Sequence, residues 1–276
     1  LTRKIKVATL LGTIQSTFTN FGYLRKVWQD NTEEERLLGV SLTGIMDSEL
    51  LNGRETGLAK TLEKLKKVAV DCNKEYAEKF NINQSTAITC VKPSGTVSQL
   101  VDSASGIHAR HNPYYIRTVR GDNKDPLTEF MKSCGIPNEP DVMKTEHTTV
   151  FSFPMKAPSG SVCRTDMTAI EQLEIWKTYA KHWCEHKPSV TISVKEEEWV
   201  PVGAWCWENF EYLSGVSFLP FSDHTYQQAP YQDIDEDTYK KLVKAMPSSI
   251  NWAKLKDFEK EDNTKGSQEL ACTAGV

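Results

Sequence analysis

The feature that most constrains this fold is an alternation, from residue 85 to about residue 246, of β-prone runs with helix-periodic segments. Runs rich in Val, Ile, Thr, Tyr and Phe predict strands. Apolar residues three and four positions apart predict amphipathic helices between them. The strand candidates are residues 85–91, 115–119, 148–153, 190–194 and 216–219. Strands separated by helical crossovers indicate an α/β fold with a mainly parallel sheet whose faces are covered.

Capping signals mark the helices between these strands. The signals are an acidic residue before proline, a glycine after the last turn, and a Thr-x-x-Glu capping box. They predict helices after Asp125 as far as Gly135, from Thr168 with Glu171 to about His186, from Pro201, and from Asp235 to Met246.

The first eighty residues are mostly helical in pattern. One helix face is predicted to carry Val7, Leu10, Leu11, Ile14 and Phe18. A charged turn at residues 29–36 precedes an apolar run at residues 37–46, which we interpret as a buried helix. Residues 58–80 predict a long amphipathic helix whose lysines and glutamates form a solvated surface.

Composition narrows the class of protein. The 276 residues are 25% charged and 39% hydrophobic, which is typical of a soluble globular chain. The net charge of −4 argues against nucleic acid or a membrane surface as the main partner. We find no apolar run of about 18 residues that would span a membrane. Seven scattered cysteines fit a reducing cytoplasm better than a disulfide framework.

The turn Pro93-Ser94-Gly95-Thr96 separates the first strand candidate from a short apolar run. Glycine lets a ligand approach the backbone closely, and free N–H groups at a helix start favour an anion. The turn is therefore a candidate phosphate cradle. The alternative is a helix-capping turn without a ligand, because Ser and Thr are preferred caps.

Longer strings around this turn are more specific than the turn itself. They are residues 92–100, 105–111, 114–120, 189–194 and 215–220. Together they resemble the large chain of ribonucleotide reductase. Within that family they are similar to the adenosylcobalamin-dependent (class II) enzymes of the monomeric type.

The resemblance implies a fold and an activity. Residues 1–259 would form the second half of a ten-stranded α/β barrel, and residues 260–276 a flexible, cysteine-bearing tail. The reductase converts ribonucleotides, here expected to be triphosphates, to 2′-deoxyribonucleotides by radical chemistry. Its implied cofactor is adenosylcobalamin, and its implied partners are the N-terminal half of the reductase and thioredoxin or a similar reductant.

The resemblance also assigns roles to residues. Pro93, Ser94, Gly95 and Thr96 would hold the substrate phosphates. Cys272 would act as a redox shuttle, carrying reducing equivalents by exchange between dithiol and disulfide. The alternative for Cys272 is a free cysteine in a disordered terminus.

The segment after the phosphate turn is a second candidate. Gly106, Ile107 and His108 would line the substrate or cofactor pocket, with a structural turn as the equal alternative. Neither His108 nor His111 lies in the Asp-x-His-x-x-Gly pattern of proteins that replace the lower base of cobalamin. We therefore expect the cofactor to keep its own base.

A cluster at residues 182–186 has the spacing of a metal site but is interpreted otherwise. His182 and His186 would share a helix face, yet Cys184 would not. Histidines near a helix end are favoured by the helix dipole, so no metal site is expected.

Some parts of the family pattern are absent from this sequence. It lacks the Asn-x-Cys-x-Glu string that supplies the family's reducing cysteine, so the chain alone is expected to be inactive. Strand 190–194 has no tyrosine pair, which speaks against a class I enzyme. The alternatives are the equivalent part of a class I or class III reductase, and a non-catalytic nucleotide-binding module.

Overall fold

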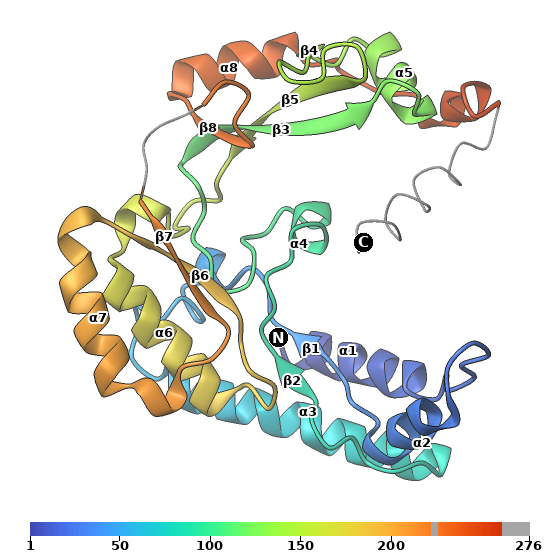
Figure 1. Ribbon diagram of the computed structural model, residues 1–276, viewed down its shortest axis with the longest axis vertical. Coiled ribbons are helices and arrows are strands. Elements are labelled where there is room, and N and C mark those ends of the chain that lie inside the picture. The colour runs from blue at the N-terminus through green and yellow to red at the C-terminus, as the bar shows by residue number, and fades with distance from the viewer. Residues whose placement is uncertain (222–225, 261–276) are drawn as a thin grey trace. The chain divides into compact units, whose positions relative to one another are not determined.

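The computed structural model describes residues 1–221 and 226–260, which fall into two compact units (Figure 1). Unit 1 comprises Leu1–Arg110 and Pro158–Phe221. Unit 2 comprises His111–Ala157 and Ser222–Val276, so part of it is inserted between two segments of unit 1. The domain boundary predicted near residue 260 stays a prediction, because residues 261–276 lie outside the described ranges.

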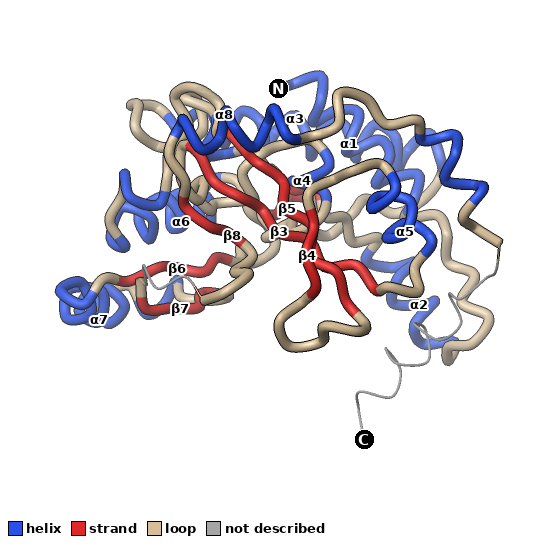
Figure 2. The backbone as a smooth tube through the Cα atoms, turned by 90° about the horizontal axis from the view of Figure 1, so that it is seen from above, coloured by secondary structure: helices blue, strands red, loops and turns tan. Residues whose placement is uncertain are grey.

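Unit 1 combines helices with two parallel strand pairs. Its helices are α1 (Thr2–Gln15), α2 (Lys26–Glu35), α3 (Leu58–Phe80), α4 (Val97–Leu100), α6 (Ala169–His182) and α7 (Trp199–Glu208). Its strands are β1 (Val40–Ser41), β2 (Thr89–Cys90), β6 (Val190–Val194) and β7 (Val216–Pro220). Strand β1 is parallel to β2, and β6 is parallel to β7. Strands β6 and β7 lie side by side in Figure 2. The predicted parallel pairing is confirmed in this unit.

Unit 2 is built on an antiparallel sheet. Its elements are β3 (Tyr114–Asp122), α5 (Pro126–Ser133), β4 (Asn138–Pro140), β5 (Thr148–Lys156), β8 (Tyr231–Asp233) and α8 (Glu236–Ala245). The strand order is β4-β5-β3-β8, and every neighbouring pair is antiparallel. Helices α5 and α8 both contact β3.

The prediction of mainly parallel strands is therefore wrong for unit 2. The alternation of side chains between two faces is the same in parallel and antiparallel strands, so it carries no information on direction. Strands β3 and β5 pair along their whole length, from Tyr114 opposite Lys156 to Asp122 opposite Thr148. Strand β5 also continues through Pro154, where the sequence predicted its end. Pro154 lies beyond the segment that β4 covers, and proline is tolerated at such edges.

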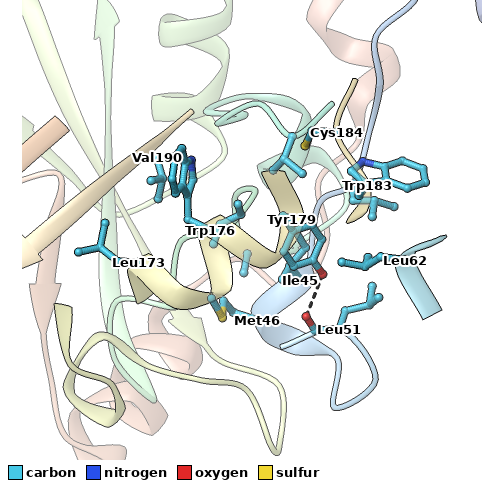
Figure 3. Close-up of a cluster of buried hydrophobic side chains, with 14 of the residues drawn as sticks. Ile45, Met46, Leu51, Leu62, Leu173, Trp176, Tyr179, Trp183, Cys184 and Val190 are labelled. Carbon is cyan, nitrogen blue, oxygen red and sulfur yellow. Dashed lines mark hydrogen bonds between the residues drawn. The ribbon is translucent and has the colours of Figure 1, made fainter. Parts of the chain in front are cut away.

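The core of unit 1 forms around α6 (Figure 3). The predicted capping box is confirmed, since Thr168 and Glu171 bond each other's backbone N–H groups at the helix start. Four side chains of α6 and its C-terminal end are fully buried: Leu173, Trp176, Tyr179 and Trp183. They pack among Ile45, Met46, Leu51 and Leu62, and the Tyr179 hydroxyl donates to the Leu51 carbonyl at 2.8 Å.

Two N-terminal predictions are corrected by the structure. Residues 37–44 are not helical, and a short 3₁₀ helix begins only at Ile45 (Ile45–Asp47). The N–H groups of Leu38 and Val40 donate to carbonyls of Ala87 and Ile88, at 3.0 and 2.8 Å. This pairing satisfies backbone groups that a helix would have satisfied internally. The charged segment interpreted as a turn is instead helical, as α2.

The first helix forms but ends at Gln15, before the predicted Phe18, and its predicted apolar face is largely exposed to solvent. Residues Ile5, Thr9 and Thr13 are the buried positions of α1. By contrast, Val7, Leu11 and Ile14 are 50, 60 and 39% exposed. Helix α3 matches its predicted ends and buries the expected stripe, including Leu62 and Ala69. No helix in residues 1–221 and 226–260 is long and apolar enough to cross a membrane.

A buried ion pair holds three separate segments of unit 1 together. The Arg110 Nε and Nη2 atoms lie 2.9 Å from the two carboxylate oxygens of Asp47. The Ala104 N–H also donates to Asp47, at 2.7 Å, and Arg110 Nη2 donates to the Asp102 carbonyl. Burial raises the pKa of Asp47, but these donors outweigh it, so the pKa lies below its usual value. The backbone of Arg110 pairs with Val162 and Arg164.

Replacing Arg110 with methionine should therefore destabilise the protein strongly. The change leaves the Asp47 carboxylate buried without its partner, which typically costs about 3–5 kcal/mol. Urea unfolding followed by circular dichroism would measure the loss. Lys26→Met is the matched control, because Lys26 pairs with Asp30 on the surface and its side chain is 71% exposed. Equal unfolding midpoints for the two variants would contradict the assignment.

Candidate functional site

The turn at residues 93–96 lies between β2 and α4 in unit 1, as predicted. Lys92 and Pro93 are exposed, and so are Gly95 and Thr96. Helix α4 has only four residues. Its macrodipole is consequently small, so any attraction for an anion must come from individual N–H groups.

Hydrogen bonds from two serines fix the shape of this turn. The Ser94 N–H donates to the Ser105 hydroxyl at 2.8 Å. The Ser94 hydroxyl accepts from the Ser98 N–H at 3.0 Å, and the Ser98 hydroxyl donates back to the Ser94 carbonyl. Ser94 is therefore bound within the protein through its backbone and its side chain.

The donors that follow Ser94 are unused within the described part of the chain. The N–H groups of Gly95, Thr96 and Val97 and the Thr96 hydroxyl have no protein acceptor there. A Cβ atom added to Gly95 would meet no atom within 4 Å. The outer side of the turn thus offers several donors around open space, where a ligand can approach the backbone.

The next loop supports the turn from inside the protein. Gly106 has φ of +53°, and a Cβ atom there would lie 3.0 Å from the Lys92 carbonyl oxygen. Only glycine fits this close approach without strain. Ile107 is fully buried in the core. Whether these residues also line a ligand pocket stays a prediction.

His108 joins this loop to strand β6. Its Nδ1 atom lies 2.8 Å from the Ser105 carbonyl, and its Nε2 atom accepts from the Thr191 N–H at 3.0 Å. The two contacts require a neutral ring with the proton on Nδ1. Burial lowers the pKa of His108, which also favours the neutral ring.

The cysteines near the turn are inert in this structure. Cys90 and Cys184 are 3 and 9% exposed. Burial raises the pKa of Cys90 and raises that of Cys184 to about 12, so neither carries a thiolate at neutral pH. Cys272, the predicted redox shuttle, lies outside the described residues.

His182 and His186, which were considered as metal ligands, have different partners and do not lie on one helix. Helix α6 ends at His182, so His186 does not share its helical face. His182 Nδ1 lies 2.8 Å from a Glu63 carboxylate oxygen, and His186 Nε2 lies 2.6 Å from the Leu38 carbonyl. Across residues 1–221 and 226–260, no group of three or more His, Cys, Asp or Glu side chains could hold a metal ion.

The sequence did not reveal what positions the turn. Ser105 bonds Ser94 directly, and the Asp47–Arg110 pair fixes Ala104 beside it. Ser105 stands in a string that resembles the family, but the partner of its hydroxyl depends on the fold. Asp47 is 63 positions from Arg110 in the sequence, and no local pattern links them.

Comparison with known proteins places this chain beside one family. It is 28% identical over 284 residues to the adenosylcobalamin-dependent ribonucleoside-triphosphate reductase of Lactobacillus delbrueckii subsp. bulgaricus, covering 90% of this chain. It is 27% identical over 230 residues to the same-named protein of Euglena gracilis, covering 81% of this chain. These matches confirm the resemblance seen in the sequence. No family model matches.

The chain spans only part of these relatives, 38% of the Lactobacillus protein and 31% of the Euglena protein. A crystal structure of a B12-dependent (class II) ribonucleotide reductase superposes on 93% of this chain with a TM-score of 0.80. The match covers 40% of that structure at 24% identity. The chain therefore shares the fold of the corresponding part of that reductase.

The neutral state of His108 predicts a pH dependence of stability. Because its folded pKa is below the ordinary 6.5, the unfolded chain binds the proton more readily. The contribution of His108 is full above about pH 6.5 and is lost as the pH falls from there toward the folded pKa. Melting temperatures of wild type and His108→Gln should therefore differ more at pH 7.5 than at pH 5.5.

The control for this measurement is His147→Gln, at an exposed histidine of unit 2. The change between the two pH values should be larger for His108→Gln than for this control. A wild-type advantage over His108→Gln that grows at pH 5.5 would show that the ring is charged in the folded protein.

Proposed function

We propose that this chain, related over most of its length to adenosylcobalamin-dependent ribonucleoside-triphosphate reductases, is one part of such a reductase. Its share of the work is to hold the phosphates of a ribonucleotide, expected to be a triphosphate, at Pro93, Ser94, Gly95 and Thr96. The finer fold, the second half of a ten-stranded α/β barrel, belongs to the same proposal.

Unused backbone donors are the observation on which the proposal depends. The N–H groups of Gly95, Thr96 and Val97 find no acceptor in the described ranges, and the space outside Gly95 is open. Phosphate oxygens are strong acceptors that bind well to such consecutive N–H groups. The Thr96 hydroxyl adds a donor. Lys92 is exposed, and its ammonium forms no ion pair with any described residue, so it can add a positive charge.

The bonds inside the turn suit this role. Ser105 and Ser98 fix Ser94, so the donors after it are held in place before a ligand arrives. A site arranged in advance loses less entropy when it binds. The rigid turn would hold the triphosphate and so fix the position of the ribose relative to the reacting groups.

The chemistry itself needs residues beyond this chain. Reduction replaces the 2′-hydroxyl of the ribose with hydrogen, releases water and oxidises a dithiol to a disulfide. The Asn-x-Cys-x-Glu string that would carry the reducing cysteine is absent from the sequence. We assign it to the N-terminal half of the reductase, and we assign Cys272 to the exchange with thioredoxin or a similar dithiol.

Adenosylcobalamin enters the proposal from the names of the relatives. When bound, it would supply the radical that starts the reaction. His108 does not fit the role of its axial ligand, since both ring nitrogens are engaged by Ser105 and Thr191. The cofactor would keep its own base. Gly106 and Ile107 would contribute to the pocket only indirectly, by fixing the course of the backbone between Ser105 and His108.

A cytoplasmic location completes the proposal. Dithiol exchange with thioredoxin needs a reducing compartment. The described cysteines fit this, because Cys72, Cys90, Cys134, Cys163, Cys184 and Cys206 are all free thiols.

Two substitutions in the turn separate phosphate binding from folding. Thr96→Ala removes one hydroxyl, and a hydrogen bond to a charged group is worth about 1.5–3 kcal/mol, so triphosphate affinity should fall roughly ten- to a hundredfold. Gly95→Val places a branched side chain where the ligand approaches and should weaken binding further. Equilibrium dialysis would compare a ribonucleoside triphosphate with its unphosphorylated nucleoside, on this chain alone and mixed with the N-terminal half of a related reductase.

Gly22→Val is the matched control, because a Cβ atom at Gly22 also meets no atom within 4 Å. All three variants should melt like the wild type without ligand. An unchanged preference for triphosphate over nucleoside in Gly95→Val would reduce the turn to a helix cap. Deoxynucleotide formation that does not require adenosylcobalamin would favour the class I or class III alternative.

A further inference from the structure

Helix α7 exposes an apolar face that the fold of unit 1 does not use. Val200 is 83% exposed, Trp207 is 84% exposed, and Phe210, just after the helix, is 75% exposed. Gly203 and Ala204 lie between them along the helix and are also exposed. We call these five residues the outer face of α7.

The opposite face of the helix is what holds it in the protein. Val202 and Trp205 are 3 and 7% exposed. The Trp205 indole N–H donates to a Glu174 carboxylate oxygen of α6 at 2.6 Å, and Asn209 is buried and caps Trp205. The outer face is therefore not needed to anchor α7.

The shape of the outer face suits a second helix. Large side chains stand at both ends of the outer face, and the two residues between them, Gly203 and Ala204, have little or no side chain. A Cβ atom added to Gly203 would meet nothing within 4 Å. Small residues allow the side-chain ridge of a second helix to approach a helix closely. Exposed tryptophan is also the residue most enriched at the energetic centre of protein interfaces.

Carboxylates border the outer face at both ends. Glu196 and Glu197 precede the helix, Glu208 is its last residue, and Glu211 follows it. All four are exposed, and none forms an ion pair with any residue in the described ranges. Negative charge at a helix C-terminus opposes the helix dipole, so Glu208 and Glu211 gain nothing from the helix itself. They form a negative rim around an apolar centre.

We propose that the outer face of α7 docks an amphipathic α-helix of another protein whose apolar side is bordered by Lys and Arg. An apolar centre with a rim of one charge sign selects a partner of that pattern. A second copy of this chain fits poorly, because antiparallel packing of two α7 helices would bring the glutamates of their opposite ends together. The proposal does not depend on the reductase assignment, since none of these residues lies in the phosphate turn.

A labelled synthetic helix of Leu and Lys, patterned to be amphipathic, is the probe, and a Leu/Glu peptide of the same pattern is its counterpart. Fluorescence anisotropy with the whole chain should detect binding of the Leu/Lys peptide only. Trp207→Ala should weaken that binding at least about tenfold, as expected for a central interface tryptophan. Glu208→Gln with Glu211→Gln should weaken it and reduce its dependence on salt.

Two further variants keep the test decisive. Gly203→Gln adds bulk at a position where a Cβ atom meets nothing within 4 Å, so it should block binding while the melting temperature is kept. Phe18→Ala is the control, because Phe18 is an aromatic residue of unit 1 that is 71% exposed and does not belong to α7. Its affinity should equal that of the wild type.

The proposal is overturned by any of three results. Equal binding of the Leu/Glu peptide would show that charge does not select the partner. Equal losses in Trp207→Ala and Phe18→Ala would show non-specific adhesion. A dimer in sedimentation velocity that disappears in Trp207→Ala would identify a second copy as the occupant.

Discussion

The buried pair of Asp47 and Arg110 is the constraint on which the candidate site depends. Arg110 reaches Asp47 through two nitrogens, at 2.9 Å each, and its backbone pairs with the segment around Val162. Asp47 in turn fixes the Ala104 N–H, next to the Ser105 hydroxyl that accepts from Ser94. A charge pair with its polar atoms satisfied can fix a single arrangement, and here it would fix the support of the proposed phosphate turn.

Local signals in the sequence predicted local structure well. The capping box at Thr168, strand β6, helix α3 and the capped start of α8 were all predicted, because each is encoded within a few neighbouring residues. What failed depended on distant partners. Strand β1 forms at Val40–Ser41 because β2 lies beside it, and only the fold supplies that partner. Strand β3 is antiparallel to β5, and the alternation of side chains along each strand does not encode that direction.

In the candidate site too, the sequence predicted the local features but not the contacts between distant segments. The turn at residues 93–96 was visible in the sequence, because Pro, Ser, Gly and Thr each have a local reason to occur there. The bond from Ser94 to Ser105 and the close approach of Gly106 to Lys92 were not, because they join loops that only the fold brings together. His108 was expected near a ligand, and the structure gives it two protein partners.

The pairing of β3 with β5 has a consequence for how this protein can vary. Tyr114 opposes Lys156, so the inserted segment His111–Ala157 leaves unit 1 and returns to it through adjacent strand ends. The Ala157 N–H donates to the Pro113 carbonyl at 2.9 Å, so the two ends of the inserted segment are bonded to each other. A segment entered and left at one point can lengthen, shorten or exchange its outer loops without moving the ends that unit 1 must hold. The segment between β3 and β5, which carries α5 and β4, is thus where a change in length would disturb unit 1 least.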